Sequence, residues 1–264
     1  MKDKHRILLV GDSCTDIYIF GDCTRLSPEA PVPIFKEFYR EYRPGMVSNV
    51  YENMVGLNLD VDVLTQKEKI KKTRLVSSPH MHHLIRIDDE PATVKKISID
   101  EIESIDISGY DACVISDYDK GFIDGYEIST LCNRFFLLAK PVFVDSKKTD
   151  LSCFDNCIIK INRYEYERIT SYPDTYDLII TMGSDGTKYQ ESIFPPFEVD
   201  IDRKSGHRDV CGAGDTFLAG LVKMYLEKKN IREAIPFANC CAAIVVNKFG
   251  VAVINEGEVR GSYG

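Results

Sequence analysis

The chain has 264 residues, a formal net charge of −8, 44% hydrophobic residues and 28% charged residues. Length and composition are those of a soluble globular protein, and we expect a single α/β domain over residues 1–264. The acidic balance argues against nucleic acid as a partner, because there is no basic stripe to neutralise phosphates. A membrane is not expected as a partner either, since no apolar run approaches the roughly 20 residues that span a bilayer.

The nine cysteines are scattered through the chain and include no Cys-x-x-Cys pair. This spacing argues against a zinc site or a thioredoxin-type site, and several of the cysteines stand in apolar stretches, where a free thiol acts as a small core side chain. The N-terminal residues lead straight into a short strand and do not resemble a signal peptide. We therefore expect a cytoplasmic protein whose cysteines are reduced.

The first predicted strand, residues 6–10, is followed by a polar turn that contains Asp16. Because α/β sheets bind ligands at the carboxyl ends of their strands, Asp16 is a candidate acceptor for two hydroxyls of a polyol, or else an ordinary turn carboxylate. The turn begins with Gly11-Asp12-Ser13, which resembles the nucleophile block of GDS-type hydrolases. Those enzymes need a late Asp-x-x-His pair, and this chain contains none, so a hydrolase is not favoured.

Short strands outside the main sheet are predicted next. Residues 18–36 carry prolines at positions 28, 31 and 33, which bar a helix and favour an edge strand or an excursion from the sheet. Two more strands, residues 73–77 and 82–87, flank a turn. The histidines at positions 80, 82 and 83 lack a carboxylate or cysteine partner at ligand spacing, so an exposed hairpin is favoured over a metal site.

Strands and helices alternate through most of the remaining chain. Strands are predicted at residues 61–64, 110–116, 141–145, 158–161 and 178–181, and helices at residues 48–58, 125–139 and 231–248. This alternation favours an α/β fold in which a parallel sheet is covered by helices on both faces.

Polar residues follow the later strands, where a ligand is expected. Lys147 is a candidate phosphate contact, and a surface lysine is the alternative. Asn162 and Glu165 stand one helical turn apart, so an amide and a carboxylate share a face that suits a hydrated Mg²⁺. The same spacing also occurs at the start of an ordinary helix.

The most informative stretch is Asp-Val-Cys-Gly-Ala-Gly-Asp-Thr-Phe at residues 209–217. Gly212 and Gly214 flank Ala213, and a helical apolar pattern begins directly after them, so several N–H groups and the positive end of a helix dipole face one spot. Such a spot binds anions, usually phosphate. Asp215 could be the general base that deprotonates an attacking hydroxyl while the N–H groups hold the transferred phosphoryl charge, or it could be a helix cap. No Lys-Ser/Thr follows, so this is not a Walker A loop.

The same stretch resembles the C-terminal signature of the ribokinase-like (PfkB) carbohydrate kinases. Residues 25–33, Arg-Leu-Ser-Pro-Glu-Ala-Pro-Val-Pro, are similar to the opening of the bacterial heptose-7-phosphate kinase branch of that family. Ser-Asp-Tyr-x-Lys-Gly at residues 116–121 and the pair Arg86 and Asp88 match the same branch. The resemblance covers nearly the whole chain.

This resemblance implies a ribokinase-like three-layer α/β/α domain with a mostly parallel sheet and a small β lid within residues 17–42 and 73–88. It implies an ATP-dependent sugar or sugar phosphate kinase that uses Mg²⁺, with a monovalent cation bordered by Asp209 and the backbone near Gly250. Relatives often pair two lids, and exposed strand edges need cover, so we expect a homodimer joined through the lid.

The resemblance also assigns roles to single residues. The implied substrate-binding residues are Asp16, Gly45, Asn49 and Lys147. The implied nucleotide and Mg²⁺ residues are Asn162, Glu165, Thr181, Gly183, Ser184, Gly186 and Asn239. The glycine loop among them reads Thr-x-Gly-x-x-Gly and opens no predicted helix, so it does not indicate a Rossmann dehydrogenase.

Two departures from the family pattern bear on the substrate. Met46 stands where the family has the second of two adjacent glycines, and its side chain is expected to intrude on the sugar or to reshape the pocket. The chain near residue 65 lacks a helical excursion that larger members carry. A kinase for another sugar or for a nucleoside, and a protein that binds such ligands without catalysis, therefore stay open as alternatives.

Overall fold

The computed structural model describes residues 4–78, 81–198, 210–248 and 250–263. Its main sheet consists of the strands β1 (Arg6–Gly11), β4 (Asp60–Leu64), β7 (Ala112–Asp117), β8 (Val142–Ser146), β9 (Cys157–Asn162), β10 (Tyr176–Thr181), β11 (Thr187–Tyr189) and β12 (Ser192–Phe194). They lie in the order β12-β11-β10-β9-β8-β7-β1-β4. The strands from β10 to β4 pair in parallel, whereas β11 is antiparallel to both of its neighbours.

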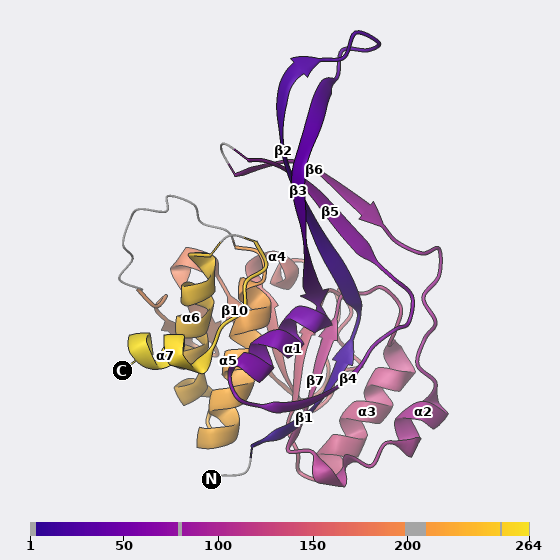
Figure 1. Ribbon diagram of the computed structural model, residues 1–264. Helices are drawn as coiled ribbons and strands as arrows, with labels where there is room; N and C mark the ends of the chain where they lie inside the picture. The colour runs from indigo at the N-terminus through magenta and orange to yellow at the C-terminus, as the bar shows by residue number, and fades with distance from the viewer. Residues whose placement is uncertain (1–3, 79–80, 199–209, 249, 264) are drawn as a thin grey trace.

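Helices cover both faces of this sheet (Figure 1). The helices are α1 (Val47–Gly56), α2 (Ile99–Ser104), α3 (Gly125–Leu137), α4 (Arg163–Tyr166), α5 (Ala213–Lys228), α6 (Ile231–Val246) and α7 (Glu256–Tyr263), with 3₁₀ turns η1 (Ile107–Gly109) and η2 (Gly183–Asp185). In β7, Ala112 and Val114 pack in the core formed with α1, α5 and α6, whereas Cys113 and Ile115 pack in the core formed with α2 and α3. Successive strand residues point to opposite faces, so this run is apolar throughout because both faces are buried. The predicted three-layer α/β/α fold is confirmed.

A second sheet of four strands stands off the main domain (Figure 1). Its strands are β2 (Ser13–Leu26), β3 (Pro33–Met46), β5 (Lys71–Ser77) and β6 (His82–Asp89), in the order β3-β2-β5-β6. The predicted small sheet is confirmed, and we call it the lid. Its strands are longer than predicted: β2 already pairs with β3 at Ser13, so Asp16 lies within a strand and not in the expected turn.

The lid is joined to the main domain by a short connection. Residues 65–70 join β4 to β5 without a helix, as the short sequence there leads one to expect. Gln66 ties this connection to the base of the lid: its Oε1 accepts from the backbone N–H of Ser13 (3.0 Å), and its Nε2 donates to the Ser13 carbonyl (2.6 Å). The first residues of β2 are therefore fixed against the main sheet.

The two faces of the lid differ in character. Asp16, Tyr18 and Phe20 alternate along β2 and are buried, and the Tyr18 hydroxyl accepts from the backbone N–H of Val251 in the main domain (3.2 Å). The opposite side, which we call the outer face of the lid, gathers through its cross-strand register Ile17, Ile19, Tyr42, Leu75, Ile85 and Ile87. Tyr42, Ile85 and Ile87 are more than half exposed, so the described residues leave this apolar surface uncovered.

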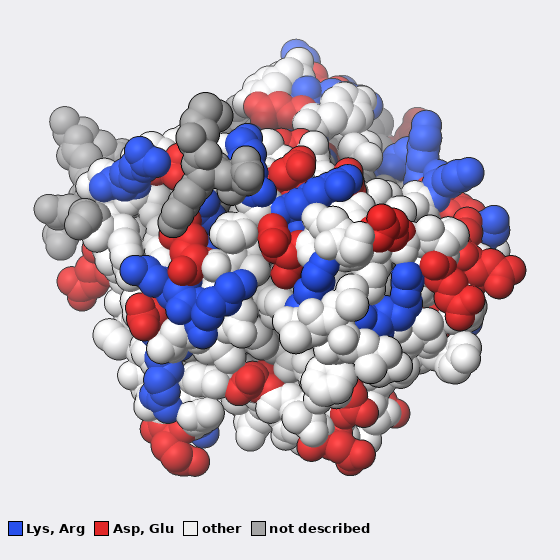
Figure 2. All heavy atoms as spheres, turned by 90° about the horizontal axis from the view of Figure 1, so that it is seen from below, with Lys and Arg blue, Asp and Glu red and all other residues white. Residues whose placement is uncertain are grey.

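On the face of the molecule seen in Figure 2, acidic and basic side chains are interspersed. Exposed ion pairs include that of Arg6 with Asp62 (2.7 Å). Across residues 4–78, 81–198, 210–248 and 250–263, no helix has both the length and the apolar character needed to cross a membrane.

Candidate active site

Asp215 lies in the first turn of α5, where this helix meets the carboxyl ends of the parallel strands, and only 6% of the residue is exposed. Asn49 Nδ2, from α1, donates to its Oδ2 (2.7 Å), and the Tyr118 hydroxyl, just after β7, donates to its Oδ1 (2.8 Å). Both carboxylate oxygens therefore accept from side chains of other elements. This geometry disfavours the helix-cap interpretation, in which the carboxylate would bond the first N–H groups of its own helix.

The surroundings of Asp215 favour the protonated form more than water does. Burial has the largest influence and raises the pKa of Asp215 above its ordinary value. The Asp145 carboxylate raises this pKa further, whereas the hydrogen bonds from Asn49 and Tyr118 and the charge of Lys160 lower it. A buried aspartate with a raised pKa is a stronger base than an exposed one, which suits proton abstraction.

Side chains of other elements closely approach the turn before α5 and the first turn of that helix. Gly212 has φ 80°, and a Cβ there would lie 2.8 Å from Asn49 Nδ2. A Cβ at Gly214 would lie 2.9 Å from Lys160 Nζ. The N–H of Ala213 donates to the Val210 carbonyl (3.3 Å), so this N–H is already engaged within the loop.

Asn49 is itself fixed by a buried hydrogen-bond network. Asn53 Nδ2 donates to Asn49 Oδ1 (3.1 Å), and Asn53 Oδ1 accepts from Thr216 Oγ1 (3.0 Å) and from the Ile254 N–H (3.0 Å). This network links α1, α5 and the segment before α7. It orients the Asn49 amide so that its N–H group points at Asp215.

Asp16 reaches the site from the lid, and it is 4% exposed. Its Oδ1 pairs with Arg74 of β5, and a Cβ at Gly45 would lie 2.1 Å from its Oδ2. Glycine is therefore required at position 45 so that β3 can pass this carboxylate. The guanidinium groups of Arg43 and Arg74 each lie 5.2 Å from the centroid of the Tyr18 ring. These cation–π contacts help to hold both arginine side chains in place on the lid.

Met46 adopts a backbone conformation that normally belongs to glycine. Its φ of 56° and ψ of −132° are strained for a residue with a Cβ, which explains why glycine suits this position. The side chain is buried with Cys14 and Ile70, and Tyr118 packs against this cluster. Met46 thus fills space next to the tyrosine that contacts Asp215.

A chain of alternating charges runs beneath the glycine loop. Lys160 Nζ lies 2.6 Å from Asp145 Oδ2, and Lys147 Nζ lies 3.2 Å from Asp145 Oδ1 and 2.5 Å from Glu165 Oε1. Burial opposes ionisation of Asp145, but the two ammonium groups outweigh it and lower the pKa of Asp145 to about 2. Lys147, predicted as a phosphate contact, is therefore held between two carboxylates and connects Glu165 to Asp145.

Asn162 and Glu165 form a capping box at the start of α4. Asn162 Oδ1 accepts from the Glu165 N–H (2.9 Å), and Glu165 Oε2 accepts from the Asn162 N–H (2.8 Å). The helix-start interpretation of this spacing is thus confirmed. Asn162 and Glu165 are only partly buried, at the carboxyl end of β9, so their polar groups remain near the strand ends.

The second glycine loop lies at the end of β10 and faces α6. Gly183 and Gly186 have positive φ values of 60° and 85°, with Ser184 between them in η2. Asn239 of α6 accepts from Thr187 Oγ1 (2.7 Å) and donates to the Pro195 carbonyl (3.0 Å). These bonds join the α6 surface to the strand that follows the loop, while Thr181 ends β10 beside it.

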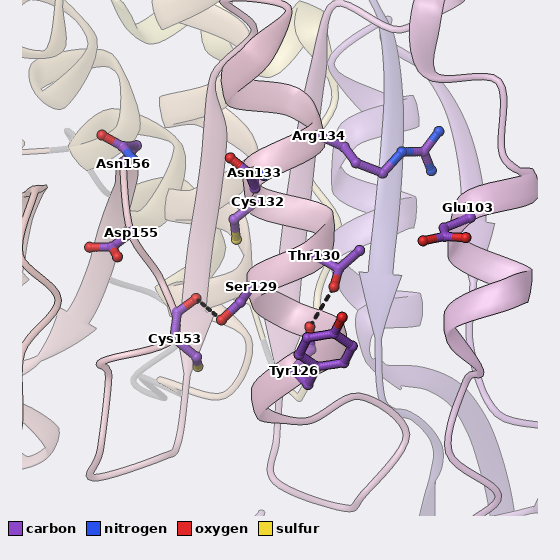
Figure 3. Close-up of a pocket in the computed structure, with 10 residues that line it drawn as sticks. All are labelled: Glu103, Tyr126, Ser129, Thr130, Cys132, Asn133, Arg134, Cys153, Asp155 and Asn156. Carbon is purple, nitrogen blue, oxygen red and sulfur yellow. Dashed lines mark hydrogen bonds between the residues drawn. The ribbon is translucent and has the colours of Figure 1, made fainter.

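A hollow of about 730 Å³ lies elsewhere, on the α3 side of the sheet (Figure 3). It is lined by Glu103, Tyr126, Ser129, Thr130, Cys132, Asn133, Arg134, Cys153, Asp155 and Asn156. None of the predicted site residues belongs to it. The convergence of buried polar groups at Asp215 is the better indication of a reaction centre.

Comparisons with known proteins agree with this geometry. A family model described as pfkB family carbohydrate kinase matches residues 158–256. The protein named Bifunctional protein HldE from Campylobacter curvus is 30% identical over 311 residues, which cover 98% of this chain and 65% of that protein. Residues 158–256 thus match the PfkB family of carbohydrate kinases, and the similarity to the HldE protein extends over nearly the whole chain.

The PfkB relatives are longer than the present chain. Bifunctional protein HldE from Marinomonas sp. is also 30% identical, and the match covers 96% of this chain and 62% of that protein. The chain therefore spans 65% and 62% of the length of these two curated relatives.

Solved structures share the fold. Phosphofructokinase-2 from Escherichia coli, determined in complex with potassium, superimposes with a TM-score of 0.73 at 12% identity. The superposition covers 99% of this chain and 98% of the phosphofructokinase-2 chain. Ribokinase from Arabidopsis thaliana, complexed with ribose and ATP, gives a TM-score of 0.71 at 14% identity and covers 98% of each chain. The predicted ribokinase-like fold is confirmed.

Sequence reasoning missed three residues of this candidate site. Tyr118 stood inside a recognised motif but received no role, although it contacts Asp215 directly. Asp145 and Lys160 were treated as parts of strands. For Lys160 a signal existed: a lysine inside the otherwise apolar run Ile158-Ile-Lys-Ile is unusual for a buried parallel strand and requires a buried partner.

Proposed function

We propose that this chain transfers the terminal phosphoryl group of ATP to a hydroxyl of a sugar phosphate. Because its motifs resemble those of heptose-7-phosphate kinases, we propose heptose 7-phosphate as the acceptor. Asp215 carries the proposal. It is a buried carboxylate at the N-terminal turn of α5, directly after a glycine loop, and neutral donors engage both of its oxygens. A carboxylate beside an anion-binding turn is unfavourable in a purely static site and suits one where it removes a proton.

In the proposed reaction the acceptor hydroxyl gives its proton to Asp215 while its oxygen attacks the terminal phosphorus of ATP. The bond to the bridging oxygen breaks, and ADP leaves. The N–H groups of Gly212 and Gly214 and the dipole of α5 stabilise the charge on the transferred group. Lys160, directly beneath Gly214, adds a buried positive charge at the same place. The protein thus contributes position and electrostatics.

ATP and Mg²⁺ belong to this proposal. We expect the nucleotide between the loop Gly183–Gly186 and the helix that carries Asn239, with its phosphates at the loop before α5. Among the described residues no group of three His, Cys, Asp or Glu side chains is arranged to hold a metal ion. Asn162 and Glu165, an amide and a carboxylate at the carboxyl end of β9, would hold Mg²⁺ through water, where it would neutralise phosphate charge.

The expected monovalent cation site remains a prediction. Asp209, one of the two positions expected to border it, lies outside the described residues.

The acceptor is expected beneath the lid, next to Asp16, Gly45 and Asn49. Basic side chains on the site-facing side of the lid support an anionic acceptor over a neutral sugar. Lys72 Nζ lies 5.5 Å from the centroid of the Tyr118 ring, and Arg74, which is ion-paired with Asp16, follows on the same face of β5. A phosphate on the acceptor would complement these charges.

A screen of ADP release tests the proposed reaction. The purified chain would be mixed with ATP, Mg²⁺ and a panel of sugar phosphates, free sugars and nucleosides. We expect turnover with sugar phosphates, highest for heptose 7-phosphate. Turnover confined to free sugars or nucleosides would favour the alternative kinase activities, and no turnover with any acceptor would favour a binding protein.

We also propose that two chains pair through the outer face of the lid. Ile85 and Ile87 on this face are 55% and 51% exposed, a liability that pairing would remove. Light scattering at tens of micromolar is expected to give twice the 29.9 kDa mass of the chain. Ile85→Asp should give the monomer mass, whereas Ile193→Asp, at an exposed isoleucine of β12, should leave the dimer intact. A wild-type monomer would refute the pairing but not the kinase.

A further inference from the structure

Tyr118 is a partly buried contact of the reaction centre that the proposed mechanism does not yet use. Its backbone N–H donates to Asp12 Oδ2 (2.9 Å), and its ring packs against the cluster of Cys14, Met46 and Ile70. The hydroxyl therefore has little freedom, and it donates to Asp215 Oδ1 at 2.8 Å. A phenol fixed in this way sets the orientation of the carboxylate that it contacts.

We propose that Tyr118 is a positioning residue for the general base, which holds Asp215 in the ionised, correctly rotated form throughout the reaction. This inference rests on the proposed kinase function. Tyr118 acts through Asp215 and is not proposed to touch the reacting atoms.

The hydrogen-bond capacity of the carboxylate allows this role. Each carboxylate oxygen can accept about two hydrogen bonds. Asn49 occupies one position on Oδ2 and Tyr118 one on Oδ1, so the carboxylate keeps capacity for the acceptor hydroxyl. With one donor on each oxygen, rotation about the Cβ–Cγ bond would break two charge-assisted bonds, and the base stays aligned.

The charges around Asp215 give the phenol a measurable effect. The titratable groups that face it come from four strands or their ends: Cys14 from β2, Tyr118 after β7, Asp145 from β8 and Lys160 from β9. Burial raises the pKa of Cys14 to about 12 and that of Tyr118 well above its ordinary value, so both stay neutral in the working range. Because the phenol stabilises the ionised carboxylate, its removal should raise the pKa of Asp215.

The test is the pH dependence of kcat/KM for Tyr118→Phe, which removes only the hydroxyl. The acid limb of this profile reports the base of the free enzyme. We expect it to move up by about one pH unit, so that activity on the limb falls about tenfold and recovers toward the wild-type value at higher pH.

Tyr110, which precedes β7 whereas Tyr118 follows it, offers a matched control. The Tyr110 hydroxyl donates to Asp62 Oδ2 at 2.8 Å, which is the same chemistry away from the site. Tyr110→Phe should leave the acid limb in place. Melting temperatures of both variants verify that they fold.

A second readout separates this inference from the kinase proposal. Carbon-13 NMR of labelled aspartate carboxyl groups follows the titration of Asp215 in the free protein, with its signal identified by its loss in Asp215→Asn. An upward shift of that titration in Tyr118→Phe supports the inference even if no acceptor is turned over, in which case only the kinase proposal fails. If neither the titration of Asp215 nor the acid limb of kcat/KM moves in Tyr118→Phe, the inference is overturned. Faster turnover of this variant without a shift would also overturn it, because the phenol would then be obstructing the acceptor.

Discussion

Asp215→Asn is expected to lower the rate of phosphoryl transfer by about 10²-fold or more, because an amide cannot take the proton of the acceptor hydroxyl. The amide can keep the local structure: its oxygen can accept from Asn49, and its NH₂ group can donate to the hydroxyl oxygen of Tyr118. The melting temperature and the KM for ATP should therefore change little. Steady-state kinetics with the best acceptor of the screen measures the effect.

A control for this substitution removes an equivalent carboxylate elsewhere. Asp62 also accepts a bond from a tyrosine hydroxyl, that of Tyr110, but Tyr110 precedes β7 whereas Tyr118 follows it, so this pair lies away from the reaction centre. Asp62→Asn should retain wild-type turnover. Turnover by Asp215→Asn close to that of the wild type would exclude this aspartate as the base.

Lys160→Met is expected to destabilise the folded protein by about 3–5 kcal/mol, because it leaves the Asp145 carboxylate buried with one ammonium partner fewer. Lys160 and Asp145 are each 2% exposed, and their charged atoms are 2.6 Å apart. Urea denaturation gives the free energy of unfolding. The double variant Asp145→Leu and Lys160→Met removes both charges and should regain much of the lost stability. Equal stability of Lys160→Met and the wild type would show that the pair is not coupled.

The same pair predicts an acid-dependent loss of stability. Asp145 has a folded-state pKa of about 2 against an ordinary value of 3.8. A group whose pKa is lowered by folding stabilises the folded state above its unfolded pKa, and this contribution disappears as the pH falls from about 4 to about 2. The unfolding free energy of the wild type should fall more steeply across this interval than that of the double variant.

Sequence reasoning predicted the fold where the chemistry is local. The alternation of apolar runs with helical patterns predicted the layered domain, and the prolines before β3 predicted a sheet apart from the main one. It also placed Asp215 at the start of a helix after a glycine loop. These features depend on turn chemistry and periodicity, which neighbouring residues determine.

The missed features depend on contacts between distant segments. Tyr118 and Asp215 are 97 residues apart in the chain, and no local pattern announces that the hydroxyl of one bonds the carboxylate of the other. Asp16 was expected in a turn because its pairing with β3 and β5 is a tertiary feature. The Asn162 and Glu165 spacing fitted a cap and a metal site equally well, since both need an amide and a carboxylate one turn apart.

The most direct test of the central claim is phosphorus-31 NMR of the wild-type chain incubated with ATP, Mg²⁺ and heptose 7-phosphate. We expect the ATP signals to be replaced by those of ADP together with a second phosphate ester on the sugar, in equal amounts, and we expect neither change with Asp215→Asn on the same time scale. Unchanged ATP, or ADP and inorganic phosphate without a new sugar ester, would contradict the proposed phosphoryl transfer.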